Sequence, residues 1–223
     1  MSEAYRTLRT NIEFSSFDKK IKTILITSSG PGEGKTTTSS NLAIVMAQGG
    51  SKTLLIDCDQ RKPSVHRVFG FSNANGLSNI LVNENEVDIN VSIQKTVVPN
   101  LHVLSSGTRP PNPAELLGSE KMKNFIEELK KTYDYIILDT PPITLVTDAQ
   151  ILSQYTDGCL LVISAGEAER DAVIKAKGLL EKVNAKILGV VINKMDSKKK
   201  GYYNYQYEYG EKGKGHSSRK KAK

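Results

Sequence analysis

The stretch Ser29-Gly30-Pro31-Gly32-Glu33-Gly34-Lys35-Thr36 decides the fold, because it follows an apolar run, 21–27, and opens onto a helical pattern. A glycine-rich turn between a strand and a helix lets successive backbone N–H groups point at phosphate oxygens. The positive end of the helix dipole strengthens the same anion site. The sequence therefore predicts a phosphate-binding loop that holds a nucleoside triphosphate.

Within this loop each residue type has a distinct expected role. The Lys35 ammonium is expected to reach the β- and γ-phosphates, and the Thr36 hydroxyl to hold Mg²⁺. The usual first glycine of the pattern is replaced by Ser29, a small residue that the turn is expected to tolerate. The predicted nucleotide-binding residues are Gly30, Gly32, Glu33, Gly34, Lys35, Thr36, Thr37 and Asn193.

Two further apolar segments end in carboxylates. The segment 54–56 is followed by Asp57 and Asp59, and the segment 135–138 is followed by Asp139. Apolar strands of this kind suit a parallel sheet, whose ligand crevice lies at the carboxyl ends of the strands. Mg²⁺ prefers hard oxygen ligands and usually binds through one or two carboxylates, water and phosphates. A magnesium site made by Thr36, Asp59 and Asp139 is therefore predicted beside the loop.

Strands and helices alternate along the chain. This pattern predicts an α/β fold, a mostly parallel twisted sheet with helices on both faces, as in P-loop NTPases. Helices are expected over 3–14, 36–48, 147–154 and 169–183, with a short helix and then a longer amphipathic one within 114–132. Strands are expected over 53–56, 101–104, 159–163 and 187–192. Between 63 and 100 only two short helices, 63–69 and 77–81, are predicted. The expected organisation is a helix in 1–20, a nucleotide-binding domain in 21–196 and a flexible tail in 197–223.

The positive charge of the chain is concentrated at its C-terminal end. The formal net charge is +7, and the tail alone carries nine basic and two acidic residues, so the remainder is neutral. Five of the nine tyrosines also lie in this tail, at Tyr202, Tyr203, Tyr205, Tyr207 and Tyr209. No apolar period surrounds them that would bury them in a core. Phenols on a mobile chain suit phosphoryl transfer better than base stacking, and no nucleic-acid partner is expected.

These motifs together resemble those of bacterial tyrosine kinases of the P-loop type, in the arrangement in which the kinase is separate from its membrane activator. Asp57-Cys58-Asp59-Gln60-Arg61 matches the second acidic motif of that family, and Asp139-Thr140-Pro141-Pro142 matches its Walker B motif. The spacing of Glu3, Arg6 and Arg9 matches its N-terminal oligomerisation motif, and the tail tyrosines match its autophosphorylation cluster. The resemblance covers 3–209.

The resemblance implies a kinase that uses ATP and Mg²⁺ to autophosphorylate its tail and regulates capsule or exopolysaccharide synthesis. It implies a ring-shaped homo-oligomer, an octamer in this family, that uses Glu3, Arg6 and Arg9. It also implies a transmembrane activator, which would recruit a cytoplasmic kinase to the inner face of the membrane. Sugar-nucleotide enzymes are implied as further substrates. Spacing alone allows a simpler explanation of the three N-terminal charges, an exposed helix face that contributes little.

The expected catalytic residues are Lys35, Asp57, Asp59 and Asp139. Asp57 is the candidate that orients the acceptor hydroxyl and takes its proton, although the roles of Asp57 and Asp59 are interchangeable at this stage. Arg61 is expected either to neutralise charge or to form a salt bridge. Because the tail is far along the chain from the loop, transfer to a neighbouring subunit is predicted.

Three alternatives stay open from the residues alone. A Min- or Par-type ATPase would carry an additional lysine at the position of Gly30, which this chain lacks. A GTPase is suggested by Asn193-Lys194-Met195-Asp196, of which only Asp196 favours guanine over adenine. The third alternative is a nucleotide-switched scaffold without kinase activity.

Overall fold

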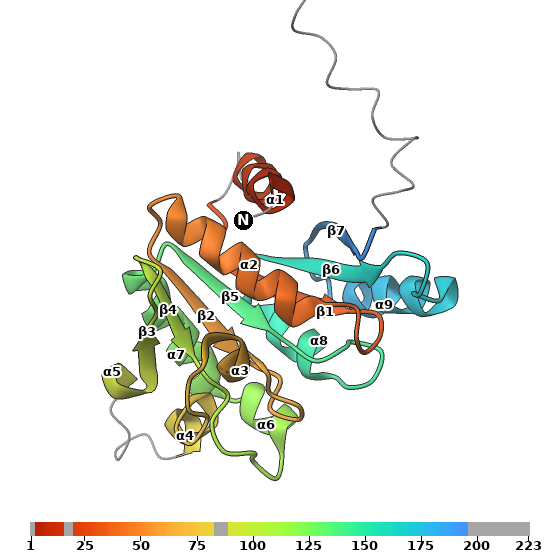
Figure 1. The fold of residues 1–223 in the computed structure, drawn as a ribbon. Coiled ribbons are helices and arrows are strands. Elements are labelled where there is room, and N and C mark those ends of the chain that lie inside the picture. The colour runs from red at the N-terminus through yellow and green to blue at the C-terminus, as the bar shows by residue number, and fades with distance from the viewer. Residues whose placement is uncertain (1–2, 16–19, 83–88, 196–223) are drawn as a thin grey trace, which may run out of the picture.

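The computed structural model describes residues 3–15, 20–82 and 89–195, and Figure 1 shows their arrangement. A seven-stranded sheet forms the centre, in the order β3-β4-β2-β5-β1-β6-β7. All neighbouring strands pair in parallel except β3, which runs antiparallel to β4. The strands are β1 (Thr23–Ser28), β2 (Thr53–Asp57), β3 (Ile93–Lys95), β4 (Leu101–Leu104), β5 (Tyr135–Asp139), β6 (Gly158–Ser164) and β7 (Ile187–Asn193).

Helices cover both faces of the sheet (Figure 1). The elements are α1 (Glu3–Phe14), α2 (Lys35–Gln48), α3 (Val65–Phe69), α4 (Leu77–Val82), α5 (Ile89–Ser92), α6 (Pro113–Leu117), α7 (Glu120–Thr132), α8 (Asp148–Leu152), the 3₁₀ turn η1 (Ser153–Tyr155) and α9 (Arg170–Lys182). None of these described helices is long and apolar enough to cross a membrane.

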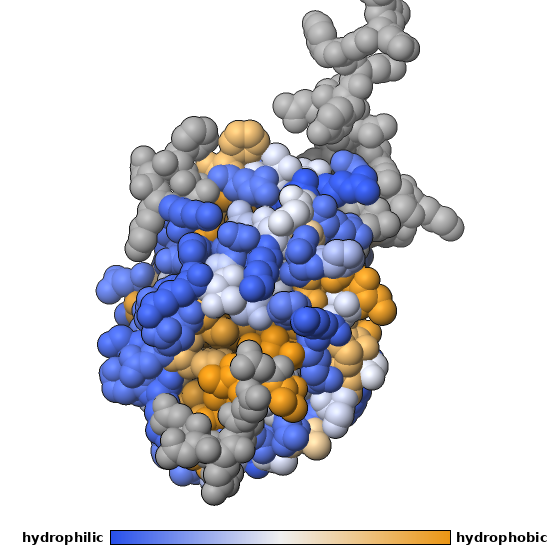
Figure 2. Space-filling model, turned by 90° about the vertical axis from the view of Figure 1, so that its left-hand side faces the viewer, coloured by the Kyte–Doolittle hydropathy of each residue, from blue (hydrophilic) through white to orange (hydrophobic). Residues whose placement is uncertain are grey.

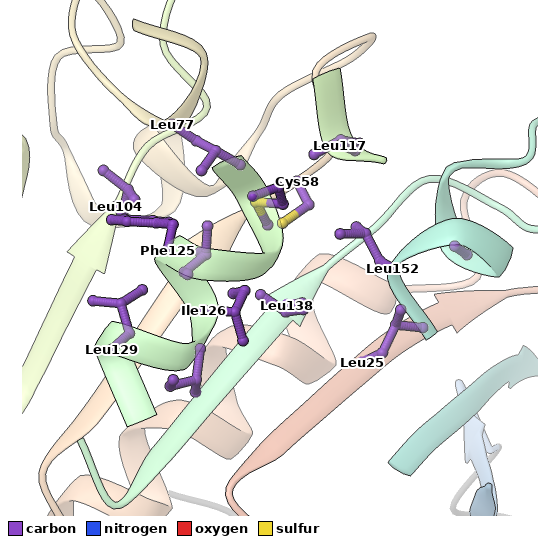
Figure 3. Packing of buried hydrophobic residues seen from close by; sticks show 14 of the residues in the cluster. Leu25, Cys58, Leu77, Leu104, Leu117, Phe125, Ile126, Leu129, Leu138 and Leu152 are labelled. Carbon is purple, nitrogen blue, oxygen red and sulfur yellow. The ribbon is translucent and has the colours of Figure 1, made fainter. Parts of the chain in front are cut away.

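Strands β1, β2, β5 and β6 are almost entirely buried because their side chains supply both layers of the core. In β1, Ile24 and Ile26 face α1 and α2, whereas Leu25 lies in the cluster on the opposite face. Figure 3 shows this second cluster, in which Phe125 and Ile126 of α7 pack near Leu138 of β5. Successive side chains of a strand point to opposite faces of the sheet. Strands that are apolar on both faces are typical of a parallel sheet covered by helices.

Helix α1 belongs to the same packed layer as α2. Its Ile12 is buried with the residues of α2, and Tyr5 and Leu8 pack against that cluster. Arg9 Nη1 donates to the carbonyl of Val45 at 3.0 Å, near the C-terminal end of α2. A cation at this end of a helix interacts favourably with the helix dipole. The N-terminal helix is thus tied to the helix that begins in the phosphate loop.

The predicted fold class is confirmed, and so is the alternation of strands and helices along the chain. The sequence prediction was incomplete between 63 and 100, where it missed α5 and β3. Both elements are very short, of four and three residues, and β3 is only partly buried, so neither produces a clear hydrophobic period. Residue 196 and the tail, 197–223, lie outside the described residues.

The sheet edge at β3 carries apolar surface. Figure 2 shows hydrophobic side chains gathered beside hydrophilic surface on the face where α4, α5 and β3 lie. Among the exposed apolar residues are Val82 of α4 and Val91 of α5, which are 57% and 72% exposed. The hydropathy of the domain surface therefore varies from place to place, and this apolar face lies next to hydrophilic surface (Figure 2).

Candidate nucleotide and phosphoryl-transfer site

The phosphate loop connects the interior strand β1 to α2, and two of its glycines adopt conformations that favour glycine. Gly32 has φ 75° and Gly34 has φ 90°, both in the left-handed region. A Cβ atom on Gly34 would lie 2.0 Å from Nδ2 of Asn193. The close approach of β7 to the loop thus requires a residue without a side chain at this position.

Ser29 contributes directly to the shape of the loop. Its hydroxyl donates to Oε1 of Glu33 at 2.6 Å, and the N–H of Gly30 donates to Oε2 of Glu33 at 2.9 Å. The Glu33 side chain is buried and closes the loop on itself. The serine in place of the first glycine therefore has a structural purpose that the sequence pattern alone did not reveal.

Lys35 lies between two of the three predicted aspartates. Its Nζ is 3.1 Å from Oδ2 of Asp59 and 3.9 Å from Oδ2 of Asp139. Burial alone would lower the pKa of Lys35, but the negative charges of Asp139, Asp59 and Asp57 outweigh it and raise this pKa. Lys35 is therefore a permanent cation beside the loop.

Two hydroxyl groups of α2 bind Asp139, and a third hydroxyl from the segment before α3 lies next to them. Thr36 Oγ1 donates to Asp139 Oδ2 at 2.6 Å, and Ser39 Oγ donates to Asp139 Oδ1 at 3.0 Å. The hydroxyl of Ser64, just before α3, lies 3.1 Å from that of Thr36. Sequence reasoning missed Ser39 and Ser64. The position of Ser39, one helical turn after Lys35, was a signal that could have identified it.

The structure distinguishes the two carboxylates of the second acidic motif. Asp57 is fully buried, and its oxygens accept hydrogen bonds from the N–H groups of Ser64, Val65 and Asp59 at 3.0, 3.0 and 3.1 Å. Burial, followed by the charge of Asp139, raises the pKa of Asp57 to about 7. Asp57 thus organises the backbone after β2.

Asp59 instead lies at the wall of a cavity that also contains Lys35. One of its oxygens accepts from the N–H groups of Arg61 and Lys62 at 3.3 and 2.9 Å, and the other faces the Lys35 ammonium. Of the two motif carboxylates, Asp59 is therefore the one in direct contact with the phosphate-loop lysine.

Arg61 forms a salt bridge rather than reaching the loop. Its Nε and Nη2 donate to the two carboxylate oxygens of Asp148 at 3.1 and 3.0 Å, and Asp148 is fully buried at the start of α8. This paired geometry is among the stronger side-chain contacts. Nothing in the sequence connected Asp148 with the site.

The donor set suits a magnesium ion that shares its ligands with phosphates. In the described ranges, no three His, Cys, Asp or Glu residues converge on a point that would hold a metal by themselves. Thr36 and Asp139 nevertheless present hard oxygen atoms side by side, with Asp59 close to the same lysine. Mg²⁺ needs only one or two carboxylates when phosphate and water supply the other ligands.

Asn193 and the N-terminal charges are also placed by the fold. Asn193, the last residue of β7, donates from Nδ2 to the carbonyl of Glu33 at 3.1 Å, so it lies against the loop. Glu3 and Arg6 form an exposed ion pair on α1 at 3.0 Å, whereas Arg9 contacts α2. Thr37 is exposed on the first turn of α2. The five tail tyrosines and Asp196 lie outside the described residues.

Comparisons with known proteins agree with this geometry. The family model of an AAA domain matches residues 21–187. Tyrosine-protein kinase YwqD of Bacillus subtilis is 48% identical over 211 residues, which cover 95% of this chain and 87% of the relative. The putative tyrosine-protein kinase CapB of Staphylococcus aureus is 46% identical, with coverage of 93% and 90%.

Solved structures give the same result. The chimerical protein CapA2B2 superposes with a TM-score of 0.84 at 43% identity, covering 87% of this chain and 84% of the other. The kinase domain of the Escherichia coli tyrosine kinase ETK superposes with a TM-score of 0.80 at 35% identity, covering 87% and 77%. The septum site-determining protein MinD of Pyrococcus horikoshii, solved with Mg-ADP, is more distant, with a TM-score of 0.64, 26% identity and coverage of 77% and 69%.

The kinase relatives and structures cover 87% to 95% of this chain, whereas the Min-type protein covers 77% and superposes with a lower TM-score. With a phosphate loop, a buried Walker B aspartate and a second acidic motif gathered around Lys35, the chain belongs to the bacterial tyrosine-protein kinases of the P-loop AAA family.

Proposed function

We propose that this kinase transfers the γ-phosphoryl group of ATP to tyrosine hydroxyls, with the tail tyrosines as its first acceptors. The contact that carries the proposal is the ammonium of Lys35 at 3.1 Å from Asp59, beside the hydroxyl and carboxylate of Thr36 and Asp139. Phosphoryl transfer requires that charge is neutralised and the reacting groups are positioned, and this arrangement supplies groups for both.

Each residue has a role in this proposal. The N–H groups of Gly32, Glu33 and Gly34 bind phosphate oxygens, and Lys35 binds the β- and γ-phosphates. Thr36, Asp59 and Asp139 hold Mg²⁺, directly or through water, and Mg²⁺ supplies neutralisation of the charge on the phosphates. Gly30 and Thr37 complete the nucleotide contacts.

The acceptor hydroxyl needs a proton acceptor, for which Asp57 and Asp59 are the candidates. The pKa of Asp57 near 7 suits a general base, but Asp57 is fully buried and does not line the cavity in front of Lys35. Asp59 lies at the cavity wall. We therefore assign the orientation of the tyrosine hydroxyl to Asp59, with Asp57 holding the segment that carries it.

The proposed nucleotide is ATP rather than GTP. Asn193 lies against the loop because its Nδ2 donates to the carbonyl of Glu33, and this bond leaves its Oδ1 as an acceptor for the amino group of an adenine. Asp196, the residue that would favour guanine, is outside the described residues. The related protein solved with Mg-ADP supports an adenine nucleotide for this fold.

The family resemblance supports the wider setting. We propose a ring-shaped homo-oligomer, an octamer, formed through Glu3, Arg6 and Arg9, in which each subunit phosphorylates the tail of a neighbour. A transmembrane activator would recruit the kinase to the inner face of the membrane and stimulate it. Capsule or exopolysaccharide assembly, including sugar-nucleotide enzymes, is the proposed target of this regulation.

A mixing experiment tests the proposal. One chain carries Lys35→Met and an intact tail, and the other carries an intact loop but ends after Met195. Separately, neither chain should become labelled from labelled ATP. Together, with an activator segment present, the Lys35→Met chain should gain phosphotyrosine, and labelled GTP should substitute poorly. No label in the mixture would contradict transfer between subunits, and equal use of GTP would contradict the adenine assignment.

A further inference from the structure

A cavity of about 230 Å³ lies directly in front of Lys35 and Asp59. One wall is apolar and is formed by Pro31 of the phosphate loop together with Pro142, Leu145 and Val146, which follow β5. Leu145 is 62% exposed, so its side chain is accessible from solvent. The cavity is smaller than the roughly 300 to 1,000 Å³ of pockets that enclose a whole drug-sized ligand.

The order of the strands places this wall at the terminal-phosphate end of the nucleotide. The phosphate loop follows the interior strand β1, with β5 and β2 on one side of it and β6 and β7 on the other. Asn193 of β7 contacts the loop from one side, and Asp59, after β2, meets Lys35 on the opposite side. If the adenine base of the nucleotide binds near Asn193, the terminal phosphate extends toward the opposite side of the loop. The apolar wall then lies beside the phosphoryl group that is transferred.

The wall is held firmly against the loop. The N–H of Ile143 donates to the carbonyl of Ser28 at 3.1 Å, and the hydroxyl of Thr144 donates to the carbonyl of Ser29 at 2.5 Å. The N–H of Leu145 donates to the carbonyl of Pro142 at 3.1 Å. The Leu145 side chain is thus presented by a fixed turn and is exposed for contact.

An apolar wall has nothing to offer a phosphate or a metal ion, but it matches the face of a phenol ring. A tyrosine ring on this surface would carry its hydroxyl toward Asp59 and Lys35, which lie in the same cavity. A buried aromatic ring gains most of its binding energy from such apolar contact. A tyrosine side chain therefore fits both the apolar wall, through its ring, and the charged groups Lys35 and Asp59, through its hydroxyl.

The ammonium of Lys62, which lines the same cavity, indicates that tyrosines next to a carboxylate bind best. Lys62 is exposed, and among the described residues no carboxylate lies within ion-pair distance of its amine. In the otherwise basic tail, the only acidic residues are Glu208 and Glu211. Glu208 separates Tyr207 from Tyr209, so a carboxylate accompanies each of these two rings.

Resting on the proposed kinase activity, we propose that the surface formed by Pro31, Pro142, Leu145 and Val146 is the acceptor site for tail tyrosines. Leu145 binds the phenol ring, and Lys62 pairs with the carboxylate next to it. The site thereby favours Tyr207 and Tyr209 over Tyr202 and Tyr203, which have no acidic neighbour.

The test measures steady-state phosphorylation of a synthetic peptide with the sequence of residues 200–212 by the full chain with its activator segment. Leu145→Ala should raise the KM for the peptide about tenfold, the usual effect of a lost apolar contact, with the KM for MgATP unchanged. Leu145→Met keeps the volume and should restore the peptide KM. The matched control is Ile174→Ala on α9, which removes an apolar side chain that is 54% exposed.

Lys62→Glu should shift phosphate from Tyr207 and Tyr209 toward Tyr202 and Tyr203 in the same peptide, as mapped by mass spectrometry. An unchanged peptide KM for Leu145→Ala, or an equal rise in the KM for MgATP, would overturn the acceptor site while leaving the kinase intact. An unchanged site preference for Lys62→Glu would overturn the role of Lys62. A wild-type chain that leaves the peptide unmodified would instead remove the proposed function itself.

Discussion

Gly34 of the phosphate loop is required for two reasons, its left-handed backbone conformation and the close approach of Asn193. Gly34 has φ 90°, and a Cβ at this position would collide with the amide of Asn193. Ser29 and Glu33 hold the beginning of the same loop through a 2.6 Å hydrogen bond. The loop is therefore preformed by its own side chains.

Gly34→Ala should weaken ATP binding by at least about tenfold, because the new methyl group must displace Asn193 or open the loop. Gly50→Ala is the matched control, since Gly50 has φ 92° but no atom within 4 Å of its Cβ position. The control should lose about 1 kcal/mol of unfolding free energy without a change in nucleotide affinity. Calorimetric titration and urea unfolding measure the two effects, and equal affinity losses in both variants would contradict the account.

Residue roles were only partly predictable from the sequence. The pattern placed Lys35, Thr36 and Asp139 together correctly, because glycine, lysine and strand-end carboxylates each have a local signature. Asp148 had no such signature, since its contact with Arg61 depends on how α8 is placed beside the loop after β2. Burial, which distinguishes Asp57 from Asp59, is likewise a property of the packed structure.

At the scale of elements, α1 and α2 form one unit. Arg9 reaches the carbonyl of Val45 near the end of α2, whereas Arg6 pairs with Glu3 on the exposed side of α1. The three charges that the sequence grouped into one motif thus face different surroundings. Equal spacing on a helix cannot reveal this difference, because it depends on which side of α1 meets α2.

Arg9→Ala should therefore lower the unfolding free energy by about 1 kcal/mol, since it removes a charged hydrogen bond at a helix end. Arg6→Ala should leave stability within about 0.5 kcal/mol, because an exposed ion pair contributes little. If both residues also serve assembly, light scattering should show smaller oligomers for both variants. A larger stability loss for Arg6→Ala than for Arg9→Ala would contradict the observed packing.

The start of β1 depends on a carboxylate from the turn before β6. Asp157 Oδ2 accepts hydrogen bonds from the N–H of Lys22, the N–H of Thr23 and the hydroxyl of Thr23, at 3.0, 2.9 and 2.9 Å. Burial by itself would raise the pKa of Asp157, but these bonds outweigh it and the pKa lies below its ordinary value of 3.8. The ionised carboxylate therefore stabilises the folded chain.

Asp157→Ala should cost about 1 to 3 kcal/mol of unfolding free energy at pH 7, because it leaves strand N–H groups without their acceptor. A lowered pKa means that this contribution is fully present above the ordinary value near 4 and is lost as the pH falls through the lowered one. Urea unfolding from pH 7 to pH 3 should show a constant difference that begins to shrink only below about pH 4. A difference that shrinks already between pH 7 and pH 5 would contradict this assignment.

At the scale of the whole molecule, the parallel sheet brings the site residues together from distant parts of the sequence. They meet at the carboxyl ends of its strands. The parallel strands β1, β2 and β5 end side by side, so the phosphate loop and the three aspartates meet there. This topology was predictable, because strand-helix alternation and apolar strands leave few other arrangements. The small β3-α5 edge was not, since such short elements are specified by tertiary packing rather than by their own period.

The most direct measurement is mass-spectrometric mapping of phosphate after the full chain is incubated with Mg²⁺, ATP and its activator, for wild type and for Lys35→Met. We predict phosphotyrosine within 202–209 in the wild type and at least about a hundredfold less in the variant, because Lys35 neutralises charge on the transferred group. Equal labelling of the two proteins, or a wild type without phosphotyrosine, would contradict the central claim.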